Sequence, residues 1–243
     1  MKKKQFWFLL VCLLCCTLFS GTALATAIVT FPNDYASDGF LANAQFTKYF
    51  GGEIRWGNDN IESGVWEYAI VPEPFANTLA QGGIEWPSSG THSYSFGHDT
   101  STQSASLMVS GGSSITAPVG TEIDGAINSV AIRAKASLPE YKSQLMDPIT
   151  ITFFGGETLT LGGLIGDANA EYLMVIDDRF ATGFTISGLA ELGGPEDTQK
   201  NSNIAYQFKV GYSNYAVPEP ATMLLLGIGL VGLAGIAKRK IKK

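Results

Sequence analysis

Two uncharged apolar segments lie near opposite ends of the 243-residue chain and limit which residues can form a folded core. The first runs from Phe6 to Phe19, after three lysines, and the second runs from Ala221 to Ala237, before a closing basic cluster. Such segments are typical of membrane-inserted helices rather than of the core of a small domain. We therefore expect the globular part at residues 26–216, which is long enough for one well-buried domain.

The N-terminal segment follows the three-part order of a secretory signal peptide. Basic residues 2–4 precede the apolar run, and small residues ending in Ala23-Leu24-Ala25 follow it. The run is shorter than the roughly 20 residues that a membrane-spanning helix needs. We therefore expect a signal helix over residues 1–25, handling by the Sec translocon and signal peptidase, and cleavage after Ala25. A permanent N-terminal anchor is the alternative.

The C-terminal segment has the composition of one transmembrane helix. A Val-Pro-Glu-Pro motif at residues 217–220 precedes the apolar span at 221–237, and a basic tail follows at 238–243. Seventeen helical residues give a length of about 25 Å, slightly less than a hydrocarbon core of about 30 Å. The basic tail is expected to stay in the cytoplasm. A plain tail anchor would have the same pattern.

Residues 217–243 resemble the PEP-CTERM sorting signal of Gram-negative bacteria, in which these three features occur in this order. The resemblance implies that Pro218, Glu219 and Pro220 form the sorting motif and that Lys238, Arg239 and Lys240 form the basic stop. It also implies an exosortase as a partner, and export in bacteria that make an extracellular polysaccharide matrix. The ectodomain is then periplasmic or extracellular, and residues 221–237 hold it in the membrane transiently or permanently.

An internal copy of the tetrapeptide shows how much the setting matters. Val71-Pro72-Glu73-Pro74 repeats the same four residues, but neither an apolar span nor a basic tail follows it. We expect a turn between strands there.

The charge of the body excludes several classes of function. Residues 26–217 hold 8 basic and 21 acidic residues, a formal net charge of −13, and no cysteine. A disulfide scaffold, a thiolate metal site and a cysteine nucleophile are therefore excluded in this part of the chain. Nucleic acid is not an expected partner, because phosphate binding needs a basic surface. The acidity also repels like-charged polymers unless divalent cations bridge them.

The body has the pattern of an all-β protein. Apolar and polar residues alternate in several short runs, which is typical of half-buried strands. In one of them, Val130, Ile132 and Ala134 fall on one face, and Arg133 and Lys135 fall on the other. About ten strands are expected, at residues 65–71, 92–96, 104–109, 129–137, 149–153, 158–161, 171–177, 184–189 and 205–212 among others. The pattern predicts an antiparallel β-sandwich, jelly-roll or Greek-key in style.

Some segments of the body are expected to depart from strand structure. Short helices are plausible at residues 40–50 and 139–146, and residues 110–124 and 193–203 are expected to be soft. Pairs of glycines are expected to form turns or bulges at 51–52, 82–83, 111–112, 155–156, 162–163 and 193–194. The body also loosely resembles the choice-of-anchor ectodomains, on the residues from Phe153 to Leu164. Those families imply no activity.

A glycan-binding platform is one candidate site in the body. Trp56, Asp59, Trp66 and Trp86 lie close in sequence, and aromatic rings and carboxylates together suit the faces and hydroxyls of sugars. The alternative is that each tryptophan belongs to the core. The same region supplies the acids for a glycan-active hydrolase, which needs two carboxylates: Glu53, Asp59, Glu62, Glu67 and Glu85.

Metal sites are a second group of candidates. Asp59, within Asn58-Asp59-Asn60, and the pair Asp177-Asp178 could contribute oxygen ligands to a structural Ca²⁺. His92 and His98 share a face if they lie on one strand, with Asp99 beside them. We expect Gly97 to interrupt that strand, which would leave both histidines in solvated loops.

Taken together, these features predict an exported, non-enzymatic surface or matrix protein with no cofactor. No nucleotide-binding glycine motif is present. A carbohydrate-binding module for exopolysaccharide is the first alternative, and a secreted glycan-active hydrolase is the second.

Overall fold

The computed structural model describes residues 26–31, 45–56, 67–72, 78–84, 91–120, 127–136, 142–166, 171–193 and 204–215. These ranges lie within one compact unit, Thr26–Ala216. The expected signal helix and C-terminal transmembrane helix lie outside the described residues. Within the described ranges, no helix combines the length and apolar character needed to cross a bilayer.

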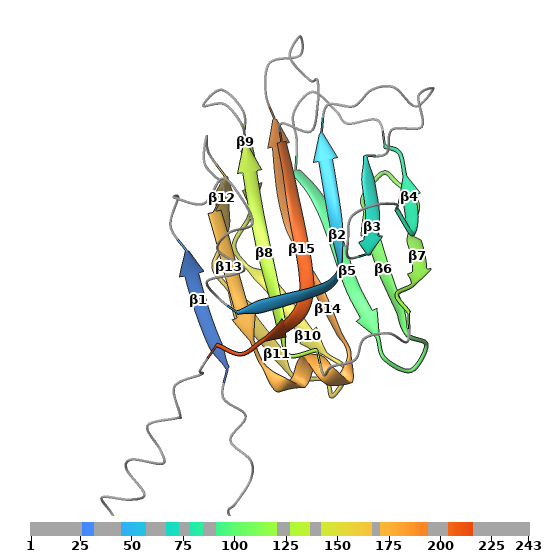
Figure 1. Cartoon of the computed structure of the whole chain (residues 1–243). Coiled ribbons are helices and arrows are strands. Elements are labelled where there is room, and N and C mark those ends of the chain that lie inside the picture. The colour runs from blue at the N-terminus through green and yellow to red at the C-terminus, as the bar shows by residue number, and fades with distance from the viewer. Residues whose placement is uncertain are drawn as a thin grey trace, which may run out of the picture. The chain divides into compact units, whose positions relative to one another are not determined.

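The described residues form fifteen strands in two antiparallel sheets, which confirms the expected all-β class. Figure 1 shows one sheet in front of the other. The front sheet has seven strands, in the order β1 (Ala27–Phe31), β13 (Glu171–Ile176), β8 (Ser129–Ala136), β15 (Ile204–Ser213), β2 (Phe46–Trp56), β3 (Tyr68–Pro72) and β4 (Ala80–Gly82).

The second sheet has eight strands. Six form a continuous order, β11 (Thr158–Leu161), β10 (Ile149–Phe153), β14 (Phe184–Gly193), β5 (Thr91–Asp99), β6 (Ser104–Val109) and β7 (Ile115–Pro118). The other two are β9 (Lys142–Leu145), which pairs with β14, and β12 (Leu164–Gly166), which pairs with β9. A short 3₁₀ helix, η2 (Asp178–Thr182), links β13 to β14.

Aromatic side chains fill the space between the two sheets. The rings of Phe96 on β5 and Phe208 on β15 stack 5.2 Å apart, and those of Tyr94 and Tyr206 lie 5.3 Å apart. All four side chains are buried, so the core joins the centre of one sheet to the centre of the other. Each fully buried aromatic side chain contributes about 1.5–3 kcal/mol of hydrophobic stabilisation.

The alternation of residue types correctly predicted which faces of β8 and β15 lie in the core. Val130, Ile132 and Ala134 are buried in the core, as are Tyr206 and Phe208. Four expected ranges, 104–109, 149–153, 158–161 and 171–177, agree with β6, β10, β11 and β13 to within one residue.

Both expected helices are contradicted where the structure describes them. Residues 46–50 belong to β2, which pairs with β15, and residues 142–145 form β9, which pairs with β14. In each segment the apolar residues also suit a strand, and pairing with a neighbouring strand outweighs the weak local helix preference. Part of the segment expected to be soft is likewise a strand, because β7 pairs with β6. The expected turn at 71–74 is also partly wrong, since Val71 and Pro72 belong to β3.

Gly51 and Gly52 lie inside β2 rather than at a turn. A side chain on Gly51 would approach the carbonyl oxygen of Phe208 on the neighbouring strand to 2.3 Å, so only glycine fits. The register between β2 and β15 shifts by one residue between Val210 and Gly211, which leaves Tyr49 as the extra residue of a bulge. Figure 1 shows both strands bending there.

Candidate functional site

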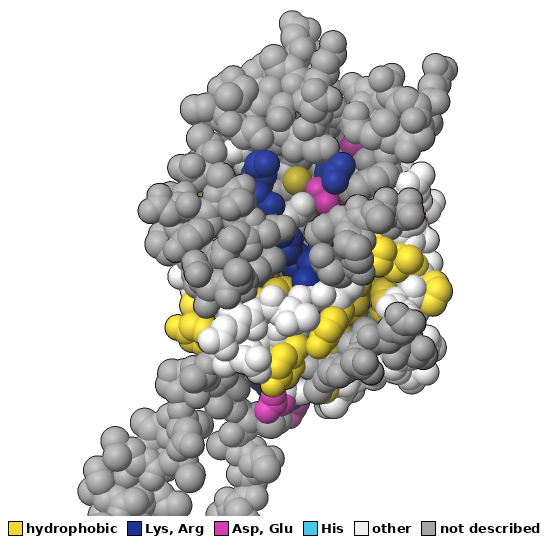
Figure 2. Space-filling view, in the orientation of Figure 1, with side chains coloured by type: hydrophobic (Ala, Val, Ile, Leu, Met, Phe, Trp, Pro, Cys, Tyr) yellow, Lys and Arg dark blue, Asp and Glu magenta, His cyan; other side chains and the backbone are white. Residues whose placement is uncertain are grey.

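Charged side chains gather on the outer face of the seven-stranded sheet, the face that points away from the eight-stranded sheet. The register places Arg133 opposite Gln207, and Gln207 opposite Glu53 on the next strand. Neighbouring strands lie about 4.8 Å apart, so this row spans about 10 Å. Five of the eight basic residues between positions 26 and 217 share this face: Lys48, Arg55, Arg133, Lys135 and Lys209. Figure 2 shows several dark blue patches on this face.

Specific contacts hold these side chains in place. Arg133 Nη1 donates a hydrogen bond of 3.2 Å to Gln207 Oε1, and its guanidinium lies 5.0 Å from the centre of the Tyr172 ring. The Lys209 ammonium lies 5.8 Å from the same ring. Arg133 and Lys209 are both buried, so they are charges held at the base of the face rather than long solvated side chains.

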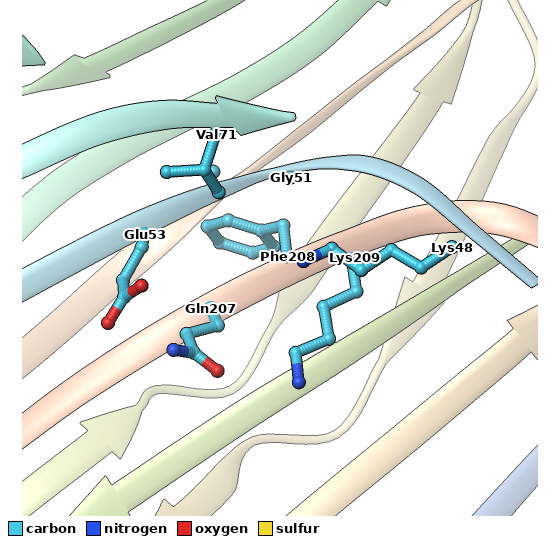
Figure 3. Close-up of a pocket in the computed structure, with 8 residues that line it drawn as sticks. Lys48, Gly51, Glu53, Val71, Gln207, Phe208 and Lys209 are labelled. Carbon is cyan, nitrogen blue, oxygen red and sulfur yellow. The ribbon is translucent and has the colours of Figure 1, made fainter. Parts of the chain in front are cut away.

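A shallow hollow lies beside this row. Its lining includes Lys48, Gly51, Glu53, Gln207 and Lys209. Figure 3 shows Glu53, Gln207 and Lys209 projecting from β2 and β15 on the same side of the sheet. The hollow has no room even for a water molecule, so it is a depression of the surface rather than a pocket that encloses a ligand.

The chemistry of the hollow is mixed. Glu53 offers a carboxylate that accepts a hydrogen bond of 2.6 Å from Arg55 Nε, Gln207 offers both a donor and an acceptor, and the lysines offer donors only. Such a set can bind hydroxyls and anionic groups together. This group of side chains, Lys48, Glu53, Arg55, Arg133, Lys135, Gln207 and Lys209, is called the sheet-face cluster below.

The glycan platform expected from the tryptophans is largely outside the described residues. Asp59, Trp66 and Trp86 all lie there, and Trp56 ends β2 with only its backbone described. The acids Glu53 and Glu67 are described and buried, and Glu53 belongs to the sheet-face cluster. The platform and the paired-acid hydrolase site therefore stay predictions.

The two histidines lie on one strand, contrary to the expectation of solvated loops. Gly97 does not interrupt β5, and the even spacing places His92 and His98 on its core face. Six residues separate them by about 20 Å along the strand, too far to share a metal ion. Asp99 points elsewhere, since its Oδ1 accepts hydrogen bonds from the Ser101 backbone and hydroxyl.

His98 is enclosed by aromatic rings. Phe50 and Phe184 lie 5.2 and 6.3 Å from the imidazole centre, and among the described residues neither ring nitrogen has a hydrogen-bond partner. Burial lowers the pKa of His98 from its usual value, and the nearby Asp99 carboxylate offsets part of this effect. The imidazole is therefore neutral at pH 7.

Asp177 forms a second polar cluster with the nearby Arg179 and with Thr26, which is far away in sequence. Its carboxylate accepts hydrogen bonds from Arg179 Nε at 2.9 Å, from Arg179 Nη2 at 2.6 Å and from the Thr26 hydroxyl. The Asp177 side chain is fully buried, and the Arg179 guanidinium also lies 4.2 Å from the centre of the Phe153 ring. A Ca²⁺ ion at Asp177 and Asp178 would have to displace Arg179. No described residues form a group of three or more potential metal ligands.

Burial and hydrogen bonding act in opposite directions on Asp177. Burial alone raises its pKa and is the largest single effect, but the hydrogen bonds from Arg179 and Thr26 together bring the pKa below its usual value. The same contacts raise the pKa of Arg179. The pair is therefore ionised across the physiological range.

Only part of the sheet-face cluster could be predicted from the sequence. Alternation on β8 placed Arg133 and Lys135 outward, but it did not show that β15 and β2 would bring Lys209, Gln207 and Glu53 beside them. The contact of Thr26 with Asp177 spans 151 positions and had no local sequence pattern at all.

The expected cleavage position Ala25, the motif residues Pro218, Glu219 and Pro220, and the basic stop all lie outside the described residues. A comparison with protein-family models tests the C-terminal part. Residues 216–240 match the PEP-CTERM protein-sorting motif, which confirms the resemblance seen in the sequence. No curated protein matches the chain.

Proposed function

We infer that this PEP-CTERM sorting-domain protein is an exported, non-enzymatic component of the cell surface or extracellular matrix. The match at residues 216–240 carries the inference, because this motif implies sorting to the cell envelope by an exosortase. Removal of residues 1–25 by signal peptidase after Sec-dependent export, a membrane span at 221–237 and a β-rich ectodomain at 26–216 complete the proposal. The fold is consistent with it, since two antiparallel sheets with a large aromatic core suit a passive, stable exported domain.

The sorting step can be tested with a matched pair of variants. In the native host, Glu219→Ala should block processing by the exosortase, so that the chain keeps its C-terminal mass and stays in the membrane fraction. Glu73→Ala changes the same residue in the internal Val-Pro-Glu-Pro copy and should leave mass and location unchanged. Mass spectrometry of both proteins gives the result. Unchanged processing in Glu219→Ala would show that the tail is a plain anchor.

A second function, binding of exopolysaccharide, is supported by the sheet-face cluster. A body with a formal net charge of −13 should repel anionic polymers, yet five of its eight basic residues share one sheet face. That face can attract an acidic glycan locally, with the Glu53 carboxylate and the Gln207 amide available for hydroxyls. The cluster thus replaces the tryptophan platform as the described part of the chain best suited to a glycan.

Binding of a polyuronate provides the test. Purified protein should be retained on immobilised polygalacturonate at low salt and released at about 0.5 M salt, because screening weakens charge-mediated contact. The double variant Lys48→Gln, Lys135→Gln should lose retention. Lys142→Gln, a partly exposed lysine on β9 in the other sheet, should keep it. Equal retention of both variants would contradict binding at the sheet-face cluster.

A further inference from the structure

The first described residue of the body lies against a buried carboxylate. In the register of β1 and β13, Ala27 pairs with Ile176, and one step further places Thr26 opposite Asp177. Directly opposed residues in antiparallel strands have Cα atoms about 4.5–5.5 Å apart. The backbone nitrogen of Thr26 is therefore close to Asp177.

Side-chain contacts support the same placement. The Thr26 hydroxyl donates a hydrogen bond to Asp177 Oδ2 and accepts one of 3.2 Å from Arg179 Nη2. Only three covalent bonds separate the Thr26 nitrogen from this hydroxyl oxygen, so the two atoms lie within about 4 Å of each other. A charge on that nitrogen would act on the carboxylate at the short range at which opposite charges stabilise one another strongly.

Counted over the described residues, the cluster around Asp177 has an excess of negative charge. Arg179 is the cation that pairs with both Asp177, at 2.6 Å, and Glu157, at 3.7 Å. Two carboxylates thus share one guanidinium, and Asp178 follows directly in the sequence. A second cation beside Asp177 would balance the charges of the pair of carboxylates.

We propose that Thr26 is the first residue of the exported protein and that its α-ammonium group is this second cation. The inference rests on the removal of residues 1–25, which is part of the proposed function. Before cleavage, the Thr26 nitrogen belongs to a neutral peptide bond. After cleavage it carries a positive charge at the position where the cluster lacks one.

Cleavage would then strengthen the attachment of an edge strand. β1 has five residues and pairs only with β13 among the described strands, so its position depends strongly on what holds its start. An ammonium beside Asp177 holds that start to the residue that directly follows β13. Removal of the signal peptide therefore frees the N-terminus of the domain and also holds the N-terminal strand β1 in place.

The test uses the full processed protein, purified in detergent from the exporting host. Mass spectrometry identifies the first residue, and the pH dependence of acylation of the α-amine gives its pKa. We expect Thr26 at the N-terminus and an α-amine pKa above the ordinary value of about 7.7–8.0. In Asp177→Asn the pKa should return to that ordinary value.

A second variant keeps the test decisive if Asp177→Asn fails to fold. Insertion of Ser-Gly between Ala25 and Thr26 leaves the Thr26 hydroxyl and Asp177 in place but moves the ammonium two residues away. We expect a lower thermal midpoint than that of the natural protein at pH 6.5. The difference should vanish near pH 10, because a group whose folded pKa is raised stabilises the fold only while it is protonated.

The outcomes separate this inference from the proposed function. Cleavage before Thr26 with an ordinary amine pKa, or equal thermal midpoints at pH 6.5, would overturn the ion pair and leave export intact. A different first residue would have the same effect. A protein that retains residues 1–25 would overturn both the ion pair and export by signal cleavage.

Discussion

Asp177 and His98 are both almost completely buried, but their surroundings differ completely. The Asp177 carboxylate receives hydrogen bonds from a guanidinium and a hydroxyl. The His98 imidazole packs between two phenylalanine rings, and neither of its nitrogens has a hydrogen-bond partner in the part of the chain that the structure describes. The first side chain is buried as an ion with its counter-ion, and the second is buried as a neutral ring.

Both environments lower a pKa, for opposite reasons. Hydrogen bonds favour the charged form of Asp177, whereas loss of water disfavours the charged form of His98. In each case the unfolded chain binds a proton more readily than the folded chain, so stability falls on acidification. The pH ranges differ, however. The loss of stability caused by His98 begins below the ordinary histidine pKa of about 6.5, and the loss caused by Asp177 begins below about pH 4.

The largest expected effect is that of Asp177→Asn. The substitution leaves Arg179, whose side chain is only 19% exposed, without its main counter-ion. Breaking a buried ion pair costs about 3–5 kcal/mol, and we expect about 3 kcal/mol because Arg179 also contacts Glu157. Urea denaturation at pH 7 measures the loss. Asp178→Asn, at the exposed neighbouring carboxylate, should change the free energy of unfolding by less than about 0.5 kcal/mol. Similar losses in both variants would contradict the role given to Asp177.

The next effect is the acid sensitivity caused by His98. The folded pKa is lowered, so stability is fully present above about pH 6.5 and falls as the pH drops toward the folded value. Within that window each pH unit costs about 1.4 kcal/mol. His98→Phe and His98→Leu should flatten the free energy of unfolding in this window, as measured by urea denaturation between pH 7.5 and 5. A natural protein with a flat profile there would show that the imidazole reaches water.

His92 should contribute a smaller part of the same acid sensitivity. It lies on the same face of β5 and burial also lowers its pKa, but the side chain is slightly more exposed than that of His98. His92→Phe should therefore flatten the profile less than His98→Phe does. Denaturation curves of the two single variants and the double variant at pH 5.5 compare them. If His92→Phe flattened the profile more than His98→Phe, His92 would be the histidine that is more strongly shielded from water.

Residue alternation predicted which side chains face the core, but not which strands are neighbours. The pattern in β8 and β15 correctly separated Val130 and Phe208 from Arg133 and Lys209. Alternation depends only on the period of the strand, so it can be recognised locally. The sheet-face cluster depends on strand order, which is set by contacts between distant segments.

Glycine was the main source of error in the strand boundaries. A glycine can end a strand, or it can allow the backbone of a neighbouring strand to come close, and the sequence does not distinguish these uses. Gly97 was expected to break a strand and instead lies inside β5, where it pairs with Thr185 and Ser106. That error placed His98 in a solvated loop, and so the burial of its imidazole in the core was not recognised.

The smallest expected effect is that of Glu157→Gln. It tests whether the charges around Asp177 affect stability beyond the buried pair of Asp177 and Arg179. Glu157 is 61% exposed and lies 3.7 Å from Arg179 Nη1, so solvent screens this contact strongly. We expect Glu157→Gln to change the free energy of unfolding by no more than about 0.5 kcal/mol.

The salt dependence of this change tests the N-terminal cation. If the α-ammonium of the processed protein lies beside Asp177, removing the Glu157 carboxylate leaves two cations and one anion, and the loss of stability should shrink as salt concentration rises. If the α-amine is far away, Glu157→Gln leaves an already balanced pair, and salt should make no difference. Urea denaturation of the processed protein in 0.05 and 0.5 M salt distinguishes these two arrangements.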